Sequence, residues 1–216
     1  MAEPPGSCQE VDIAAVARLY DAMAGEYAGR YGDDLRPGSG DRAFLEVALE
    51  SARADGPVLD LGCGPGQIAA IAASWGLPAI GVDVSLNMLA VARRRVPQAT
   101  FIAGDARALP LASRSCRAVA AFYWFHHVPR PLLPAVLAEA RRVLRPGGTL
   151  VIAAHLGAGE RWVTKESESL RVTLYGRDEL AGHVRDAGFD VESVGTRVPR
   201  PDEFQAEHGF LRARLA

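Results

Sequence analysis

Short apolar runs alternate with amphipathic segments through the middle of this chain. Five runs have the length of buried strands, and they lie at 57–61, 79–83, 100–103, 118–123 and 149–154. Three intervening segments carry apolar residues at helical spacing, at 67–75, 86–95 and 131–144. Ser85 is placed to cap the second of these helices, and Gly76 to end the first. Strands that alternate with helices predict an α/β fold whose parallel sheet is covered on both faces.

The N-terminal part of the chain is predicted to be helical and to contain no strand. Helical spacing predicts helices at 11–30 and 42–52, joined by a breaker-rich loop at 36–40. Residues 1–10 are expected to form a disordered tail. The remainder, 11–216, is predicted to be a single domain, because its length suits one core better than two.

The C-terminal part departs from the strand–helix alternation. A helix at 178–187 is stopped by Gly188 and followed by strands at 191–198 and 209–214. These strands have no helix between them, so we expect an antiparallel hairpin at one edge of the sheet. The polar segment 157–175 is expected to be flexible and to become ordered when substrate binds.

Composition narrows the functional classes. The net charge of -2 offers no basic surface for nucleic acid. Three separated cysteines, Cys8, Cys63 and Cys116, form neither a disulfide framework nor a metal-ligand spacing, so no metal site is predicted. The first residues lack a signal peptide, and no apolar stretch is long enough to span a bilayer. We therefore expect a cytoplasmic protein, of bacterial origin by its Ala, Arg and Gly content, that is a monomer or homodimer without a membrane or nucleic-acid partner.

The strongest chemical signal is a glycine-rich turn directly after the first predicted strand. The stretch 58–66 places Gly62, Gly64 and Gly66 at GxGxG spacing, with Asp60 two residues before the first glycine. Such a turn lets a ligand lie against the backbone. A carboxylate beside it repels a pyrophosphate and attracts a cation. S-adenosylmethionine, with an ammonium and a sulfonium, therefore fits this turn better than NAD does.

Two more aspartates end the next strands. Asp83 follows the turn by about 20 residues, where a carboxylate can accept hydrogen bonds from ribose hydroxyls. Asp105 follows the third strand and could accept a hydrogen bond from an adenine amino group. Any one of these aspartates could instead be a helix cap or a turn former. Three of them at the same edge of a parallel sheet favour a ligand-binding role.

Four motifs together resemble the class I S-adenosylmethionine-dependent methyltransferases of the small single-domain kind. They are VLDLGCGPG (58–66), GVDVSLNMLAVARRR (81–95), FIAGDARALPL (101–111) and EARRVLRPGGTLVIAAH (139–155), and they occur in the family's order. The resemblance extends from about residue 11 to the end. It implies a three-layer Rossmann-like fold, with a seven-stranded, mostly parallel sheet and a reversed C-terminal strand.

The same resemblance implies roles for individual residues around S-adenosylmethionine. Asp60, Gly62 and Gly64 match positions around the methionine part, Asp83 the ribose, Val84 and Met88 the faces of adenine, and Asp105 and Ala106 its edge. Within 11–52, a helical lid region, Tyr20 and Tyr27 match aromatic residues that close over the cofactor. Cys63, a spacer between the glycines, and Tyr123, a wall residue, complete the predicted cofactor contacts.

Candidates for the chemistry itself follow the fourth strand. His127 matches a position that is commonly histidine in the family, and it could take a proton from an acceptor hydroxyl. It could equally be structural, holding a loop or capping a helix. His126 is interpreted as structural. His155 and Trp162 could line an acceptor pocket, or Trp162 could pack on the core.

These residues predict methyl transfer from S-adenosylmethionine to an oxygen or nitrogen atom of a small molecule, such as a natural product. Two alternatives stay open at this stage. One is a protein that binds S-adenosylmethionine without methylating, using it structurally or as a charge. The other, an NAD-dependent oxidoreductase, is disfavoured by Asp60 and by the GxGxG spacing.

Overall fold

The computed structural model describes residues 13–32, 35–50, 56–165, 168–201 and 203–216. The predicted tail at 1–10 lies outside these residues. The helices are α1 (Ile13–Tyr31), α2 (Gly40–Glu50), α3 (Gln67–Ser74), α4 (Leu86–Arg95), α5 (Leu133–Val143) and α6 (Arg177–Asp186), with short 3-10 turns η1 (Phe125–His127) and η2 (Arg130–Leu132). None of the helices in the described part is both long and apolar enough to cross a membrane.

Seven strands form one sheet in the order β3-β2-β1-β4-β5-β9-β8. Their bounds are β1 (Val58–Leu61), β2 (Ala79–Asp83), β3 (Thr100–Ala103), β4 (Cys116–Phe122), β5 (Leu144–Leu156), β8 (Phe189–Arg197) and β9 (Glu207–Leu215). The pairs from β3 to β5 are all parallel, and β9 runs antiparallel to both β5 and β8. The predicted fold class is confirmed. The C-terminal hairpin also forms as predicted, but β9 inserts between β5 and β8.

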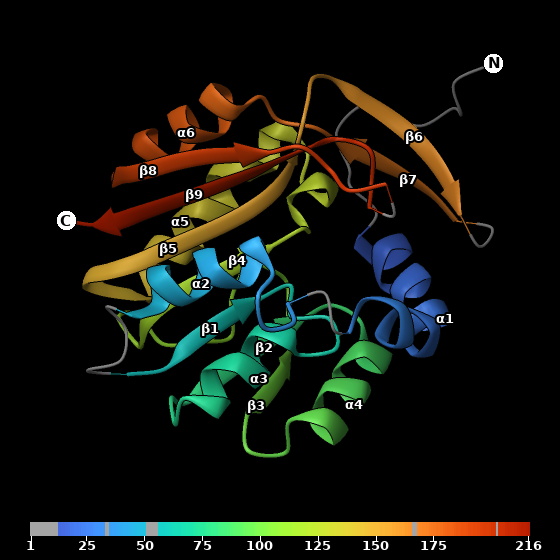
Figure 1. Ribbon diagram of the computed structural model, residues 1–216, viewed down its shortest axis with the longest axis horizontal. Helices are drawn as coiled ribbons and strands as arrows, with labels where there is room; N and C mark the ends of the chain where they lie inside the picture. Colours follow the sequence, from blue (N-terminus) through green and yellow to red (C-terminus); the bar gives the residue numbers. More distant parts are fainter. Residues whose placement is uncertain (1–12, 33–34, 51–55, 166–167, 202) are drawn as a thin grey trace.

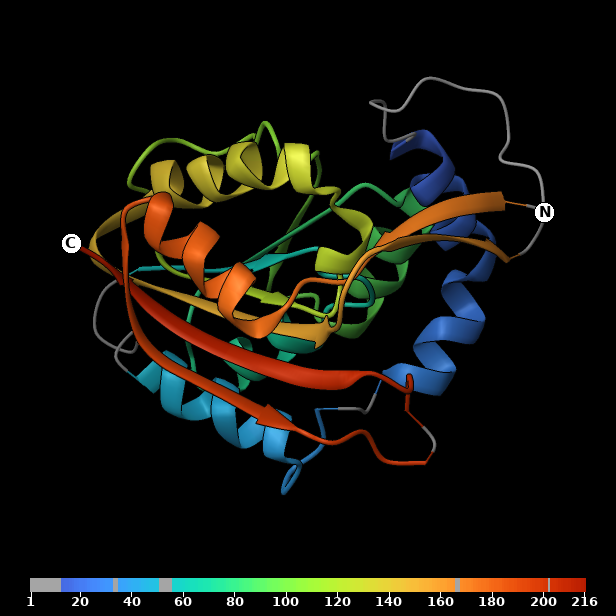
Figure 2. The same ribbon diagram turned by 90° about the horizontal axis from the view of Figure 1, so that it is seen from above.

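Alternating side chains of the central strands separate two cores. Figure 2 shows α5 and α6 on one side of the sheet and α2 on the other. Leu59 and Val119 pack on one face with α5 and α6, whereas Val58 and Ala118 pack on the other with α2, α3 and α4. Consecutive strand residues point to opposite faces, so strands covered on both sides are apolar throughout. The central strands are held rigidly by this burial, which fixes the positions of their carboxyl ends.

The lid helix lies at the edge where the parallel strands end. Figure 1 shows α1 beside α4 and close to a second, two-stranded sheet. That sheet is a hairpin of β6 (Glu160–Lys165) and β7 (Glu168–Thr173). Leu19 and Met23 of α1 pack with Leu170 of β7 in a small separate core. The α1 helix and the hairpin therefore enclose the ligand-binding edge of the sheet together.

The hairpin corrects one expectation. The segment 157–175 was expected to be flexible, but β6 and β7 pair over their whole length, from Glu160 with Thr173 to Lys165 with Glu168. The Glu160 carboxylate also accepts a hydrogen bond from the Thr173 hydroxyl. Pairing and the contact of β7 with α1 give the described part of this polar segment a defined structure.

Element boundaries were predicted well where a local signal exists. The Ser85 hydroxyl accepts a hydrogen bond from the Met88 N–H and caps α4, as predicted. Gly76 and Gly188 have the positive φ expected after α3 and α6. The sequence Pro146-Gly147-Gly148 was expected to precede the fifth strand, but β5 already begins at Leu144.

Candidate active site

The turn after β1 brings the chain's backbone against an open cavity. Gly62 and Gly64 have φ values of 70° and 47°, a region that side chains disfavour. A Cβ at Gly62 would lie 2.6 Å from the ring of Trp124, whereas a Cβ at Gly64 would meet nothing within 4 Å. Cys63 between them is buried, and burial raises the pKa of its thiol well above the ordinary value. A protonated thiol in this position agrees with the predicted spacer.

Most of the predicted cofactor residues converge on one cavity, here called the first cavity. Those that line it are Tyr20, Tyr27, Gly62, Cys63, Gly64, Asp83, Val84, Met88, Asp105, Ala106, Tyr123 and His127. They come from the lid helix and from the carboxyl ends of β1, β2, β3 and β4. The sheet therefore brings the sequence-predicted residues together, while their roles toward a cofactor stay predictions.

Asp60 lies behind the glycine turn and does not line the first cavity. It borders an adjoining cavity, here called the second cavity, which shares Gly62 and Tyr123 with the first. The Asp60 carboxylate accepts a hydrogen bond of 3.0 Å from the Ala69 N–H of α3. Burial raises the pKa of Asp60 to about 8, the Ala69 hydrogen bond opposes this rise, and the nearby charge of Asp83 adds to it. A positive charge beside Asp60 would favour its ionised form.

Asp83 organises the turn and the start of α4 at the same time. Its carboxylate accepts hydrogen bonds of 2.8 Å from the Gly64 N–H and 2.9 Å from the Ser85 N–H. Burial raises the pKa of Asp83, although these hydrogen bonds oppose the shift. Neither Asp60 nor Asp83 forms an ion pair with any residue that the structure describes, so the pair is suited to a cationic ligand.

Asp105 differs from these two because it has a cationic partner within the chain. Its carboxylate forms an ion pair of 2.7 Å with Arg107 and also accepts the Arg107 backbone N–H. Partial burial would raise the pKa of Asp105, but these hydrogen bonds lower it overall. If the Asp105 carboxylate bound the adenine edge, it would accept hydrogen bonds from adenine and from Arg107 at the same time.

The lid helix is attached to α4 by a residue that the sequence analysis did not single out. The Asp21 carboxylate accepts hydrogen bonds from the Ser85 hydroxyl at 2.6 Å and the Asn87 N–H at 2.9 Å. The Asn87 side-chain amide in turn donates to the Asp21 carbonyl. Asp21 thus supplies an acceptor to the free N–H groups that begin α4. An acid on the lid that bonds to Ser85 also links the lid to the strand end that carries Asp83.

His127 is bonded to the lid in this structure. Its Nε2 lies 2.8 Å from the Tyr20 hydroxyl, and the two rings meet edge to face. Burial lowers the pKa of His127 to about 4, so the imidazole is neutral near pH 7. This hydrogen bond supports the structural alternative for His127, and its role as a general base stays a prediction.

The second cavity adjoins the first and has a volume of about 450 Å³. The two share wall residues, among them Tyr20, Gly62, Tyr123 and His127. Apolar residues of α1 and β7 form one side of the second cavity, and His126, His155 and His208 border the other. Trp162 is 54% exposed on β6 and is not in the wall, so it has neither of its two predicted roles.

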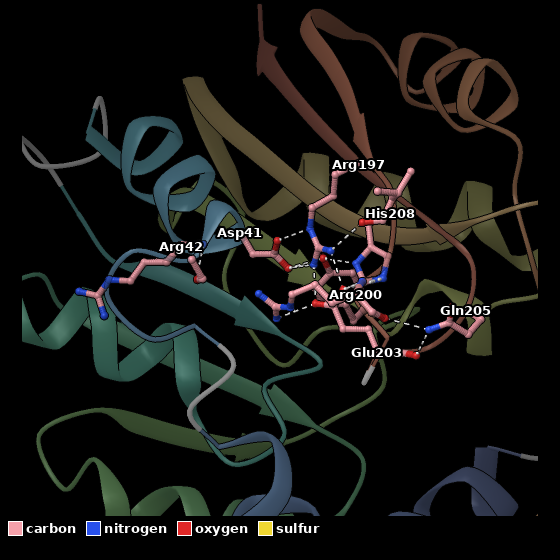
Figure 3. A network of polar contacts seen from close by, with 10 residues as sticks. Asp41, Arg42, Arg197, Arg200, Glu203, Gln205 and His208 are labelled. Atoms are coloured by element: carbon pink, nitrogen blue, oxygen red, sulfur yellow. Dashed lines mark hydrogen bonds and ion pairs between the residues drawn. The ribbon is translucent and has the colours of Figure 1, made fainter.

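A polar network fixes the far wall of the second cavity (Figure 3). Arg197, at the end of β8, forms ion pairs of 2.8 Å with Asp41 of α2 and 2.6 Å with Glu203. The Tyr123 hydroxyl donates to Asp41 at 2.5 Å and lies 2.9 Å from Nδ1 of His208. Burial and the Asp41 charge raise the pKa of Tyr123, so its hydroxyl stays protonated. Residues from four distant segments therefore hold Tyr123 in place.

Comparison with known proteins agrees with this geometry. A family model described as a methyltransferase domain matches residues 58–148. A demethylmenaquinone methyltransferase of Renibacterium salmoninarum is 45% identical over 140 residues, covering 64% of this chain and 57% of that relative. A ubiquinone/menaquinone biosynthesis C-methyltransferase, UbiE, of Methylobacterium nodulans is 32% identical over 225 residues, covering 96% of this chain and 84% of that relative. The chain belongs to the S-adenosylmethionine-dependent methyltransferases.

The family's solved structures share this fold. The 1,6-didemethyltoxoflavin-N1-methyltransferase of Burkholderia thailandensis, solved with its substrate and S-adenosylhomocysteine, has a TM-score of 0.71 and 20% identity. The similarity covers 98% of this chain and 94% of that one. The chain spans 57%, 61% and 54% of the first three curated relatives that it matches, all named demethylmenaquinone methyltransferases.

The residues present fit the family's cofactor. Two buried carboxylates, Asp60 and Asp83, have raised pKa values that a sulfonium or ammonium would offset. Gly64 leaves open space beside the backbone, and the indole N–H of Trp124 is buried in the first cavity wall without a partner among the described residues. The charge and the polar groups of this cavity therefore suit S-adenosylmethionine, which is the expected cofactor.

Several residues of the site lacked a local sequence signal. Asp21, Asp41 and His208 act through partners at least 64 residues away, namely Ser85, Arg197 and Tyr123. Glu203 pairs with the nearer Arg197 and Arg200. Only the polarity of their positions near predicted element ends could have drawn attention to them.

Proposed function

We propose that this protein transfers the methyl group of S-adenosylmethionine to a ring carbon of a small hydroxyaromatic acceptor of the quinol type. The observation that carries the proposal is the shared wall of the two cavities at Gly62, Tyr123 and His127. A cofactor in the first cavity would present its methyl group to a molecule in the second. The mixture of apolar and imidazole groups around the second cavity suits an aromatic ring that carries a hydroxyl.

The names of the relatives support carbon as the acceptor atom. The sequence alone favoured oxygen or nitrogen, but one relative over 30% identical is named a C-methyltransferase of ubiquinone/menaquinone biosynthesis, and another is named a demethylmenaquinone methyltransferase. A hydroxyl activates the neighbouring carbon of an aromatic ring toward an electrophile. In carbon methylation the hydroxyl activates the ring and remains free, whereas in oxygen methylation the hydroxyl itself would receive the methyl group.

S-adenosylmethionine supplies a methyl carbon bonded to positively charged sulfur and would leave as S-adenosylhomocysteine, while the ring carbon that gains the methyl group would lose its hydrogen as a proton to solvent. The chain's own part is to align the acceptor with that methyl group and to exclude water. The α1 helix and the β6–β7 hairpin cover the cavities, and Tyr20 closes over His127. The neutral state of His127 leaves the acceptor side without an added positive charge.

The test is a reaction with S-adenosylmethionine and 1,4-naphthalenediol under nitrogen, analysed by mass spectrometry. We expect a ring-methylated diol and an equal amount of S-adenosylhomocysteine. Methyl addition at oxygen would correct the acceptor atom. Formation of neither product across a panel of phenols and quinols would overturn the proposal and favour a protein that binds the cofactor without methylating.

The Asp83→Ala variant is the matched control for that reaction. Loss of its carboxylate removes the acceptor of the Gly64 and Ser85 N–H groups and the predicted ribose contact. We expect product formation to fall at least tenfold at fixed cofactor concentration, with restoration as that concentration rises. Unchanged affinity in calorimetry would refute the ribose assignment.

A further inference from the structure

Two imidazoles on the second cavity have hydrogen-bonding capacity that nothing in the described chain uses. The Nδ1 atoms of His126 and His155 are buried without a partner among the described residues. The Tyr123 hydroxyl beside them is engaged by Asp41 and His208, whereas Nδ1 of His127 and Nε2 of His208 also have no hydrogen-bond partner among the described residues. Buried polar atoms are nearly always hydrogen-bonded in proteins. An unmet pair beside a cavity therefore points to a ligand that carries a hydrogen-bonding group.

Of the two, His155 is held more firmly. Its ring stacks on Tyr123 with centroids 4.8 Å apart and an interplanar angle of 27°. Phe204 approaches at 4.8 Å, and His208 meets the ring edge-on at 4.8 Å. Contacts on three sides leave the remaining edge of the imidazole as the part that a ligand can address. His155 is the next-to-last residue of β5 and lies at the carboxyl edge of the sheet, where ligands bind in such folds.

The orientation of Tyr123 is itself imposed by the surrounding network. Tyr123 has a φ of 56°, which is unfavourable for a residue with a side chain. Its hydroxyl is fixed by Asp41 and His208, and Asp41 is fixed by Arg197. Strain at a cavity wall persists only when the surroundings enforce it. The network thus determines the plane on which His155 stacks.

The charge state of His155 favours an uncharged ligand group at its ring. Burial lowers the pKa of His155 to about 3, with the neighbouring His126 and His208 adding to the shift. A neutral imidazole accepts a hydrogen bond from a hydroxyl as readily as it can donate one. It gives no ion-pair attraction to a carboxylate or phosphate.

We propose that His155 accepts a hydrogen bond from the acceptor's hydroxyl, and that Tyr123 is the positioning residue that fixes the His155 ring. The inference rests on the proposed function for the identity of the acceptor. A hydroxyl that donates to an imidazole increases the electron density of the adjacent ring carbon. The same contact would select hydroxyaromatic acceptors over their ethers.

The experiment measures binding, so it does not depend on turnover. The protein is saturated with S-adenosylhomocysteine, and the affinities of 1,4-naphthalenediol and 1,4-dimethoxynaphthalene are compared by calorimetry under nitrogen. The ether keeps the ring but lacks the hydroxyl. We expect the wild-type protein to prefer the diol by about tenfold. Equal affinity for both compounds, or no binding of the diol, would overturn the proposal.

Variants assign that preference to residues. His155→Phe should abolish the diol preference while leaving the ether's affinity within about twofold, and His155→Gln, which can still accept a hydrogen bond, should keep part of it. Tyr123→Phe should reduce the preference about threefold with the ether again unaffected. A purely structural role would weaken both ligands together, and that outcome would refute the positioning assignment.

Two further variants complete the test. His183→Gln on α6 lies outside both cavities and should leave both affinities unchanged. Loss of the preference in His126→Phe but not in His155→Phe would move the contact to His126 and reject the proposal. If His155 controls the preference but the wild-type protein releases no methylated product, the binding assignment stands and the proposed function fails.

Discussion

Asp60 and Asp83 place two carboxylates under the same glycine turn with no ion pair among the described residues. Both have raised pKa values, and that of Asp60 reaches about 8. The free protein therefore holds a proton on Asp60 at neutral pH. A cationic ligand favours the carboxylate over the carboxylic acid, so binding should release that proton.

The Asp60→Asn variant tests this coupling. Asparagine can keep the acceptor for the Ala69 N–H but cannot become negative. We expect S-adenosylmethionine to bind the variant about 10- to 100-fold more weakly above pH 8. In the wild-type protein, affinity should rise with pH up to about pH 8 relative to the variant. Comparing the two proteins cancels the titration of the ligand's own amine.

Calorimetry in buffers of different ionisation enthalpy provides the measurement. The wild-type protein should release more protons on binding than Asp60→Asn near pH 7. Identical proton release and identical affinities would show that Asp60 does not sense the cofactor's charge.

His127 and Tyr20 form a second pair whose roles can be separated. Because they share a hydrogen bond of 2.8 Å, His127→Ala and Tyr20→Phe should each weaken cofactor binding by about fivefold. The double variant should be no weaker than either single variant, since the same bond is lost once. A general base would give a different result: His127→Ala would lower kcat by about 100-fold or more while Tyr20→Phe stayed near normal.

At the scale of elements, α1 is attached to α4 and lines the first cavity. Its Asp21 bonds to Ser85 and Asn87, and Arg95 of α4 donates to the α1 carbonyl of Ala28. Most of these bonds lie at the start of α4, next to the strand end that carries Asp83. The lid and the predicted ribose site are therefore mechanically joined.

The Asp21→Ala variant should weaken the attachment of α1 to α4, because it removes the acceptor of the Ser85 and Asn87 hydrogen bonds. We expect faster hydrogen exchange of the α1 amides in the free protein and about tenfold faster cofactor dissociation, with a smaller change in association. Glu26→Ala, on an exposed position of the same helix, is the matched control and should behave as wild type. Equal exchange rates in both variants would show that Asp21 does not hold the lid.

The sequence predicted the elements that carry local signals. The strand–helix alternation from β1 to β5, the Ser85 cap and the glycine turn all reflect short-range rules of burial and backbone geometry. The β6–β7 hairpin was not predicted, because its residues are mostly polar and its structure comes from strand pairing and from contact with α1. The structure of the hairpin depends on a tertiary contact, and the local sequence pattern does not indicate that contact.

The same limit applies to the second cavity. The glycine turn and two strand-end aspartates lie close together in sequence, so the predicted cofactor residues converge as expected. The wall around Tyr123 joins Asp41 to Arg197, which are 156 positions apart. The order of strands in the sheet brings these distant residues together, so the sequence around each residue does not predict the network.

For the molecule as a whole, we expect the free energy of unfolding to decrease both toward acid pH and toward alkaline pH. His126, His127, His155 and His208 have lowered pKa values, so the unfolded chain binds more protons below pH 6.5 and acid destabilises the fold. Asp60 and Asp83 have raised values, so the folded chain binds more protons between about pH 4 and 8. Above pH 6.5 the aspartates act, joined toward pH 9 by the buried thiols of Cys63 and Cys116, and stability should fall as pH rises.

We therefore expect the free protein to unfold at its highest temperature near pH 6.5. Each excess bound proton changes the unfolding free energy by about 1.4 kcal/mol per pH unit. Asp60→Asn should flatten the alkaline side and steepen the acid side, because Asp60 opposes the histidines between about pH 4 and 6.5. Thermal melts from pH 5 to pH 9 provide the check, and a maximum above pH 8 would contradict the assignment.

The position of β9 has a consequence for how the chain is made. This strand is the last of the sheet in sequence order, yet it lies between β5 and β8. Until the ribosome releases it, β5 has an open backbone edge and β8 has no neighbour to pair with. Open edges of this kind recruit other chains. The growing polypeptide thus remains vulnerable to self-association until β9 has been made, and shielding of β5 by a chaperone would matter most in that interval.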